Sequence, residues 1–249
     1  MINSLRFMKN FIKKSIRYLL TPFILVDYWR FKILDKKSRF RLSLKDAYPC
    51  INDNTIKTGF DRHYVYHTSW AARKLAETKP AFHMDISSSL YFSGIVSAFI
   101  PVKFYDYRPA ELVLSNLTSE RADLLNLPFK DTSVNSLSCM HVVEHIGLGR
   151  YGDNIDPDSD LKAIGELCRV LNVGGNLFFV VPVGEPTIEY NAHRIYSYEQ
   201  VVNYFSKLSL KEFTLIPENN GGMIPLATKE QVSKERYGCG CFWFTKLAK

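Results

Sequence analysis

Two histidines, at positions 145 and 193, are the residues best suited to move a proton. A histidine side chain titrates near neutral pH, so His145 and His193 are candidates for a general base. Glu144 directly precedes His145 and can orient one of the two imidazoles. An alternative stays open for each histidine, because its imidazole can instead form only a hydrogen bond with a loop backbone. Arg150 and Arg194 are candidates to hold a phosphate or carboxylate group of a substrate.

The stretch around Glu144 also matches a metal-binding pattern. His141-Val-Val-Glu-His145 has the H-x-x-E-H spacing of the inverted zinc peptidases, in which the histidines bind the metal and the glutamate is the general base. That motif needs a long helix, but a glycine-rich stretch begins at Gly147. Zinc proteolysis through His141, Glu144 and His145 stays an alternative, and we assign no metal ligand.

Three aspartates lie where predicted strands end, namely Asp85, Asp106 and Asp123. Ligands of an open α/β sheet bind in the crevice beyond the carboxyl ends of its strands. An acid after the second strand can accept both hydroxyls of a ribose, and one after the third can accept from an adenine amino group. Aspartate is also common in turns and caps, so each one alone is ambiguous. Together the three favour a ligand that carries an adenosine.

A predicted series of strands and helices positions these residues. Apolar runs at 82–86, 102–105 and 134–140 predict strands, and another short strand ends near Asp123. Helical patterns lie between them, which is typical of βαβ units and a mostly parallel sheet. We therefore expect ligand-binding side chains at one edge of this sheet.

A helix is predicted over 61–79, where Pro80 ends the helical pattern. It leads into the sheet and carries a second pair of histidines, His63 and His67. We interpret this pair as lying on the helix surface, with Tyr64 and Trp70 packed inward.

The next predicted helix covers 157–171. Asp156 is expected to cap it, and Gly174 and Gly175 to end it. Residues 176–181 form the most apolar run of the chain, as expected for a central strand that is covered on both faces.

The last part of the chain predicts one more helix and two strands. Ser197 and Gln200 form a capping box, which places the start of a helix there. Strands over 210–216 and 241–246 are expected to pair in antiparallel orientation. The expected fold class is therefore α/β, with a Rossmann-like, doubly wound, mostly parallel sheet and an antiparallel last strand.

Five segments at or near the predicted strand ends resemble the motifs of the class I S-adenosylmethionine-dependent methyltransferases. They are His83-Met-Asp-Ile-Ser-Ser-Ser-Leu-Tyr-Phe-Ser-Gly94, Tyr105-Asp106, Ala122-Asp-Leu-Leu-Asn-Leu-Pro-Phe129, Cys139-Met-His-Val-Val-Glu-His-Ile146 and Glu166-Leu-Cys-Arg-Val-Leu-Asn-Val-Gly-Gly-Asn-Leu177. Residues 144–153 and 191–194 are similar to a family of uncharacterised methyltransferase-like proteins often found near polysaccharide genes. The resemblance implies S-adenosylmethionine as the cofactor and the following cofactor-binding residues: Asp85, Ser87, Ser88, Ser89, Asp106, Asp123, Leu124 and His141.

The loop after the first strand departs from the family pattern. The family has glycines there, because its backbone approaches the cofactor closely, whereas this chain has Ser87, Ser88, Ser89 and Tyr91. Serine is small enough for that approach, and its hydroxyl can bond to the methionine part of the cofactor. The departure nevertheless motivates an alternative, a non-catalytic domain that uses this fold as a binding or scaffold module.

The positive charge of the chain is concentrated in an N-terminal arm. Residues 1–41 contain eleven Lys and Arg against two Asp, a net charge of +9, and the rest of the chain has −2. We therefore expect an arm over 1–58, a methyltransferase-like domain over 59–249, and no nucleic-acid partner. Apolar residues between Leu5 and Leu20 recur at helical spacing. Such an amphipathic helix can lie on an anionic membrane or pack on protein.

These patterns together predict a methyltransferase that acts on a small-molecule or glycan hydroxyl. Five cysteines without a CxxC pair favour a reducing cytoplasm, with peripheral membrane contact through the arm as an option. Methylation of a hydroxyl needs in-line positioning and a base. His145 and His193 are the candidates for that base, and Glu144 for the residue that orients it. The oligomeric state is not predicted.

Overall fold

The computed structural model describes residues 22–50, 53–87, 89–219 and 221–248. The chain divides into two compact units, residues 1–59, here the arm unit, and residues 60–249, here the sheet unit. The predicted amphipathic helix from Leu5 to Leu20 lies outside the described residues, so its membrane contact stays a prediction. Within the described part of the chain, no helix has the length and apolarity that crossing a bilayer requires.

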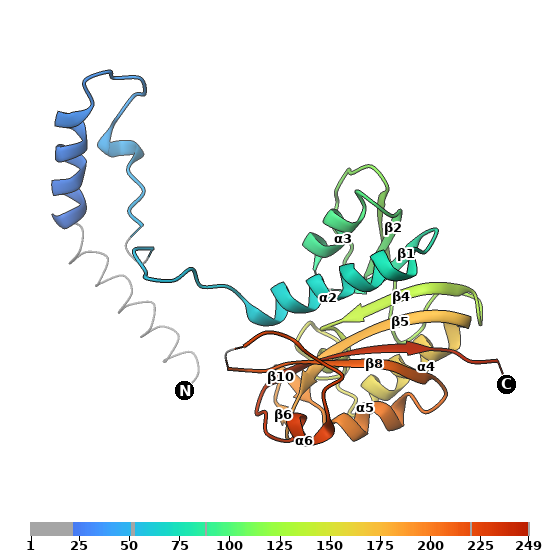
Figure 1. Ribbon diagram of the computed structural model, residues 1–249. Coiled ribbons are helices and arrows are strands. Elements are labelled where there is room, and N and C mark those ends of the chain that lie inside the picture. Colours follow the sequence, from blue (N-terminus) through green and yellow to red (C-terminus); the bar gives the residue numbers. More distant parts are fainter. Residues whose placement is uncertain (1–21, 51–52, 88, 220, 249) are drawn as a thin grey trace. The chain divides into compact units, whose positions relative to one another are not determined.

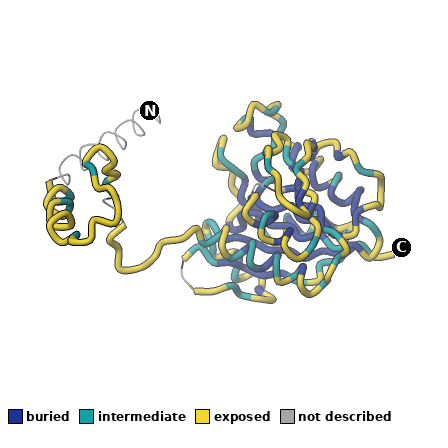
Figure 2. The backbone as a smooth tube through the Cα atoms, turned by 90° about the horizontal axis from the view of Figure 1, so that it is seen from above, coloured by how far each residue is buried: buried dark blue, intermediate teal, exposed yellow. Residues whose placement is uncertain are grey.

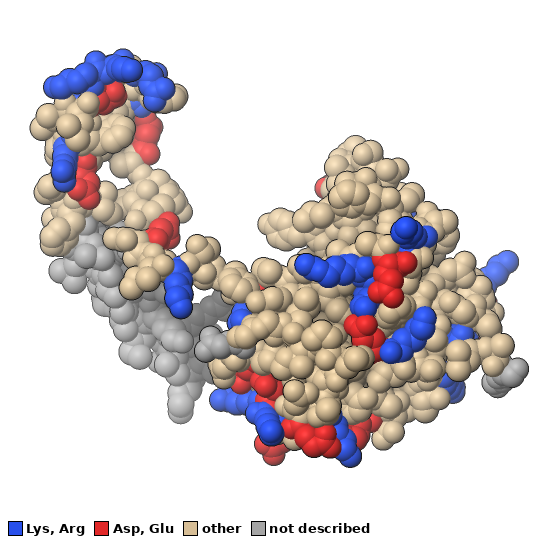
Figure 3. All heavy atoms as spheres, viewed as in Figure 1, with Lys and Arg blue, Asp and Glu red and all other residues tan. Residues whose placement is uncertain are grey.

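Most of the described residues of the arm unit, 22–50 and 53–59, are exposed (Figure 2). Residues 22–34 are helical, and a short 3₁₀ helix, η1 (Leu44–Asp46), follows. Ser43 caps η1 by accepting a hydrogen bond from the backbone N–H of Lys45. Lys and Arg side chains gather on the face of this unit that Figure 3 shows, whereas both signs are mixed on the sheet unit.

One large sheet forms the centre of the sheet unit, with strand order β3-β2-β1-β4-β5-β10-β8-β9 (Figure 1). Its strands are β1 (His83–Ser87), β2 (Val102–Asp106), β3 (Leu117–Arg121), β4 (Val134–Met140), β5 (Leu171–Val183), β8 (Ser209–Ile216), β9 (Ile224–Pro225) and β10 (Gly238–Thr245). The pairs among β1 to β5 are parallel, and β10 is antiparallel to both β5 and β8. The predicted fold class is confirmed.

Helices cover both faces of this sheet. On one face lie α2 (Arg62–Thr78) and α3 (Leu90–Val96), and on the other α4 (Ser159–Val170) and α5 (Tyr198–Tyr204). The side chains of β5 alternate between the two layers, since Phe178 packs with α2 and Phe179 packs with α4 and α5. This double burial explains why β5 is the most apolar strand.

The capping box of Ser197 and Gln200 is confirmed at the start of α5. The start of α4 differs from the expectation, because Asp158 occupies the cap position. Asp156 instead holds the preceding turn, where it accepts hydrogen bonds from the Asp158 backbone at 3.0 Å and the Ser159 hydroxyl at 2.9 Å. The Asp158 side chain itself makes no capping hydrogen bond.

The end of α4 lies within one residue of the prediction, but the role predicted for the two glycines was wrong. The helix ends at Val170 and β5 begins at Leu171, so Gly174 and Gly175 lie inside the strand. Gly174 has a φ of 75°, and it lies where the register between β4 and β5 shifts. These glycines therefore lie at an irregularity of the strand. A pair of glycines is common both there and after a helix end, so the local sequence does not distinguish the two.

The short elements that were not predicted include the strands β6 (Thr187–Glu189) and β7 (His193–Ile195), which pair as a hairpin, the strand β9, and the helix α6 (Lys229–Val232). Each is four residues or fewer, too short for a hydrophobic period to be recognised. β3 ends at Arg121, two residues before the aspartate expected at its end.

Candidate functional site

A pocket of about 620 Å³ lies at the carboxyl end of β4. It brings together all three predicted catalytic residues, Glu144, His145 and His193, with the predicted cofactor residue His141. The rest of its wall includes side chains that the sequence did not nominate, among them His63, Tyr64 and Tyr237. The lining residues come from α2, the loop after β4, the β6–β7 hairpin and the segment before β10. The pocket therefore forms only when the whole sheet unit is folded.

The glycine-rich loop after β4 builds one side of this pocket. The chain turns into a 3₁₀ helix, η2 (Val143–His145), and then reaches Gly147 with a φ of 79°. A Cβ atom at Gly147 would lie 2.1 Å from the carbonyl oxygen of Asp156, so only glycine fits. The Asp153 carboxylate accepts hydrogen bonds from the backbones of Gly147, at 2.7 Å, and Gly149. The loop is thus folded around one acid.

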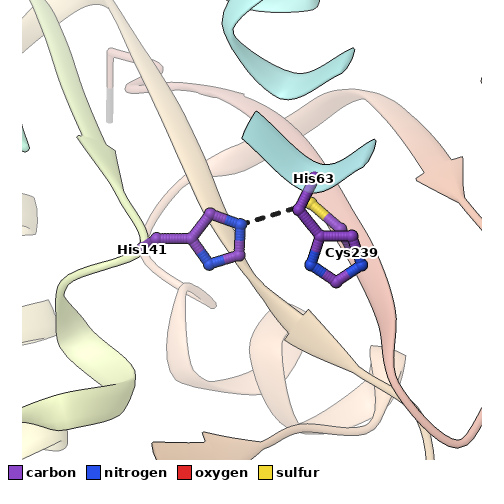
Figure 4. Close-up of side chains that lie close together, drawn as sticks. All are labelled: His63, His141 and Cys239. Carbon is purple, nitrogen blue, oxygen red and sulfur yellow. Dashed lines mark hydrogen bonds between the residues drawn. The ribbon is translucent and has the colours of Figure 1, made fainter. Parts of the chain in front are cut away.

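His141 lies between an acid and a thiol. Its Nδ1 donates to Oε1 of Glu144 at 2.8 Å, and its Nε2 is 3.5 Å from Sγ of Cys239 (Figure 4). Burial lowers the pKa of His141, but the contacts with Cys239 and Glu144 outweigh that effect and raise it to about 10. Burial also raises the pKa of the Cys239 thiol, so this cysteine is not an activated nucleophile.

His145 has one nitrogen committed and one available. Its Nδ1 donates to the carbonyl oxygen of Ala192 at 2.6 Å, and the Arg150 guanidinium donates to the same oxygen at 3.0 Å. The neutral imidazole therefore carries its proton on Nδ1 and leaves a lone pair on Nε2. Oε1 of Glu144 lies 3.8 Å from that Nε2. This arrangement suits a general base.

His193 lines the same pocket, with its ring centroid 6.3 Å from that of His145 and 5.0 Å from that of Tyr237. Burial lowers its pKa, against the opposing effect of Glu189 and Glu144. Its Nε2 is buried and has no hydrogen-bond partner among the described residues. A lowered pKa keeps this imidazole neutral at neutral pH.

The zinc-peptidase alternative is not supported by this geometry. The motif needs both histidines on one long helix, but η2 has only three residues and His141 precedes it. Glu144 is hydrogen-bonded to His141, so its Oε1 is not available as a general base for a bound water. The pattern H-x-x-E-H arises here from a turn at a strand end.

The interpretation of the histidine pair on α2 was partly wrong. Trp70 is buried as expected, but Tyr64 is 38% exposed and His67 is fully buried. Nδ1 of His67 donates to the carbonyl oxygen of His63 at 2.6 Å. Burial, with His141 nearby, lowers the pKa of His63 to about 4. Helical spacing carried a signal for this burial, because Ala71 and Leu75, four and eight residues after His67, lie on the same helix face and are buried.

Asp85 lies within β1 and is fully buried, which differs from its expected place at an exposed strand end. The Ser138 hydroxyl on β4 donates to its carboxylate at 2.5 Å, and the Ser93 hydroxyl on α3 also donates to it. Burial raises the pKa of Asp85 to about 7, although both hydrogen bonds oppose that shift. The residue thus ties β1, β4 and α3 together beneath the loop that the family uses for its cofactor.

The remaining predicted cofactor residues fall into three groups. Asp106 ends β2 and Asp123 lies in the turn after β3, each with one carboxylate oxygen accepting from the backbone two residues on. Leu124 is buried in the core and Ser89 is buried at the start of α3, so neither presents an open surface. Ser88 and the side chain of Ser87 lie outside what the structure describes, and their roles stay predictions.

Asp106, at the end of β2, has a carboxylate oxygen that is available to a ligand. The second carboxylate oxygen of Asp106 has no hydrogen-bond partner among the described residues, and the side chain is only partly buried. A ribose hydroxyl can therefore be accepted there without displacing a protein contact. Asp106 is not among the residues that line the pocket around His141.

The two candidate arginines differ. Arg150 is exposed on the pocket wall. Arg194 is buried, and it donates to the carbonyl oxygens of Ile146, at 2.6 Å, and Pro157. Arg194 therefore holds the loop after β4 in place and is not free to bind a substrate anion.

The sequence and the fold were compared with those of known proteins. The profile described as a Caenorhabditis protein of unknown function, DUF268, matches residues 129–210, and no curated protein matches the sequence. A chain of the solved complex between the Haloferax volcanii Trm112 methyltransferase activator and a proposed methyltransferase is 20% identical, with a TM-score of 0.52 over 76% of this chain and 91% of that chain.

Two further solved structures are similar at lower scores. The YcgJ protein from Bacillus subtilis is 14% identical, with a TM-score of 0.49 over 73% of this chain and 100% of that one. A Burkholderia thailandensis 1,6-didemethyltoxoflavin-N1-methyltransferase is 8% identical, with a TM-score of 0.48 over 73% of this chain and 79% of its own. With the strand order observed, the chain has the Rossmann-like fold of the class I S-adenosylmethionine-dependent methyltransferases, as its motifs predicted.

Proposed function

We propose that this protein is an S-adenosylmethionine-dependent methyltransferase whose acceptor is a hydroxyl of a small molecule or glycan. The observation that carries the proposal is His145, a base in a fixed tautomer in the wall of a pocket at the carboxyl end of β4. The fold supports it, because ligands of open α/β sheets bind beyond the carboxyl ends of the strands.

S-adenosylmethionine, when bound, supplies an electrophilic methyl group. Asp106 would hold the ribose, and Asp123, exposed in the next turn, would accept from the adenine amino group. This places the adenosine over β2 and β3, and leaves the pocket around His145 for the acceptor. Methyl transfer needs in-line positioning above all, which a pocket walled by α2 and two loops provides.

The acceptor hydroxyl must lose a proton as its oxygen is methylated. Nε2 of His145 can take that proton, since Nδ1–H is held by the Ala192 carbonyl. The imidazolium that forms lies 3.8 Å from the Glu144 carboxylate, which stabilises the positive charge. Arg150 and His193 line the same pocket, with donors that suit neighbouring hydroxyls of a polyol.

The first test measures cofactor binding. Isothermal titration with S-adenosylhomocysteine should show one site per chain for the wild type and a large loss of affinity for Asp106→Ala. Asp131→Ala is the matched control, because Asp131 precedes β4, pairs with Arg169 and is far along the strand from the pocket. A correctly folded wild type that binds no S-adenosylhomocysteine would leave the non-catalytic binding domain as the better reading.

The second test measures turnover. S-adenosylhomocysteine release is followed with a panel of methyl glycosides, free monosaccharides and nucleotide sugars as acceptors. For an acceptor that reacts, His145→Ala should lower the rate by about 10²–10⁴-fold and leave cofactor affinity unchanged. Equal rates for the wild type and His145→Ala would remove this histidine as the base, and His193→Ala would then be tested in the same assay.

A further inference from the structure

Three metal-binding side chains from distant parts of the sequence meet beside the pocket. His63 comes from the first turn of α2, His141 from the residue after β4, and Cys239 from the start of β10 (Figure 4). Their ligand atoms all lie within 4.8 Å of one another. His63 and His141 also line the pocket, whereas Cys239 is fully buried behind them.

The spacing of these donor atoms is that of a zinc site. Zn–N and Zn–S bonds of about 2.0 and 2.3 Å at a tetrahedral angle place the two donor atoms about 3.5 Å apart. Nε2 of His141 and Sγ of Cys239 are 3.5 Å apart. The separations to His63 are no longer than 4.8 Å, so the His63 imidazole must move closer by roughly 1 Å when a metal binds.

Glu144 provides the outer contact that zinc-bound histidines usually have. Metal-binding histidines commonly donate their second ring N–H to a carboxylate, which fixes the ring and the tautomer. Nδ1 of His141 donates in this way to Oε1 of Glu144, so Nε2 is the nitrogen that faces Cys239 and can bind a metal. The ring is therefore already oriented for coordination.

Two buried polar atoms independently point to a cation here. Glu144 is 1% exposed, its Oε2 has no hydrogen-bond partner, and its ion pairs within the described chain are with histidines alone. His67 is fully buried, its ring centroid is 4.9 Å from that of His141, and its Nε2 also lacks a partner in the described part of the chain. A buried carboxylate oxygen and a buried imidazole nitrogen that lack a hydrogen-bond partner are costly, and a cation bound to Nε2 of His141 would supply positive charge to both in place of the proton on that ring.

We propose that His63, His141 and Cys239 bind a Zn²⁺ ion at the wall of the pocket, with a fourth coordination position that takes an oxygen ligand. Two imidazoles and a thiolate are donors that zinc prefers. Three protein ligands beside an open pocket are the pattern of catalytic rather than structural zinc sites. The oxygen ligand would be the acceptor hydroxyl, a role that rests on the proposed function, whereas metal binding itself does not.

The test uses the full chain, stripped of metal with a chelator and titrated with Co²⁺ and then Zn²⁺. Co²⁺ bound to a thiolate gives a charge-transfer band in the near ultraviolet, and tetrahedral Co²⁺ gives strong visible bands. We expect both from the wild type at one equivalent per chain, and loss of both when Zn²⁺ is added. Elemental analysis of the zinc-loaded protein should give about one ion per chain.

Three variants identify the ligands. Cys239→Ser should lose the charge-transfer band, His63→Ala should weaken Co²⁺ affinity by more than tenfold, and Glu144→Gln should weaken it by about 10–100-fold. Cys168→Ser is the matched control, because Cys168 is also buried but lies on α4 in the other layer. It should bind like the wild type. His63→Ala keeps the test decisive if Cys239→Ser does not fold, since His63 is only partly buried.

Two results would overturn the zinc site. One is a folded wild type that shows no tetrahedral Co²⁺ spectrum at excess metal. The other is a spectrum that survives unchanged in both Cys239→Ser and His63→Ala. Titrating S-adenosylhomocysteine into the metal-free and the zinc-loaded protein separates this inference from the proposed function. Metal binding without cofactor binding would keep the site and refute the methyltransferase, and the reverse would refute the site alone.

Discussion

Replacing Asp85 by asparagine should change how the stability of the protein depends on pH. Asp85 is fully buried, and its pKa rises from 3.8 to about 7 on folding because burial disfavours the carboxylate. The folded state therefore holds a proton that the unfolded state releases between about pH 4 and pH 7. The stability that this proton contributes is fully present below pH 4 and is lost as pH rises through 7. Asparagine has nearly the same shape, and its carbonyl oxygen can accept from one of the two serine hydroxyls while its amide N–H donates to the other.

The size of the effect follows from the two pKa values. A shift of about three units corresponds to about 4 kcal/mol over the whole range, and to roughly 2–3 kcal/mol between pH 5 and pH 8. The pKa of nearby His83 is lowered by burial to about 3, so His83 adds stability as pH rises from 3 to 6.5. This opposite trend is present in both proteins and cancels when the variant is compared with the wild type.

The assay is urea unfolding of the wild type and Asp85→Asn at pH 5, 6, 7 and 8. The free energy of unfolding of the variant minus that of the wild type should become more positive by roughly 2–3 kcal/mol from pH 5 to pH 8. A difference that stays constant across this range would show that Asp85 is not a neutral acid in the folded protein. It would refute the argument from burial.

Two further predictions concern stability, and urea unfolding checks both. Gly147→Ala should destabilise the protein by about 2–4 kcal/mol, since the new Cβ meets the Asp156 carbonyl and the φ of 79° is strained for alanine. Gly165→Ala, in the middle of α4 with open space around its Cβ position, should instead stabilise by about 0.5–1 kcal/mol; equal effects would contradict the steric account. Phe205→Ala should cost about 3–5 kcal/mol, because the buried ring packs 4.7 and 4.6 Å from the rings of Phe179 and Phe244. A loss below 1 kcal/mol would mean that α5 is not part of this core.

Signals confined to a few residues predicted the fold well. Asp61 caps α2 by accepting from the Tyr64 backbone at 3.1 Å, and Ser197 with Gln200 starts α5. These contacts act over three residues, so the sequence shows them directly. β4 covers the residues expected of it, and the polar residues Asp131, Thr132 and Ser133 precede it.

Contacts between distant segments could not be predicted in the same way. Cys239 is 98 residues from His141 and meets it only because β10 is inserted beside β5. Arg194 has the charge of a substrate ligand, yet its donors are used by backbone carbonyls of the loop after β4. Asp85 was expected to be a ligand-binding acid at a strand end, but two serine hydroxyls from other elements donate hydrogen bonds to its carboxylate. Residue type and spacing give the chemistry of a side chain, whereas its partners depend on tertiary packing.

The position of β10 has a consequence for how the chain folds as it is synthesised. β10 pairs with β5 on one side and β8 on the other, yet the ribosome makes it after both. Until it emerges, the apolar edge of β5 is open, and β8 is available to pair with it directly. Such a pairing would exclude β10 and leave Cys239 away from His141. We therefore expect the nascent chain to need protection at this edge, and a chaperone that shields exposed strands to increase the yield of native protein.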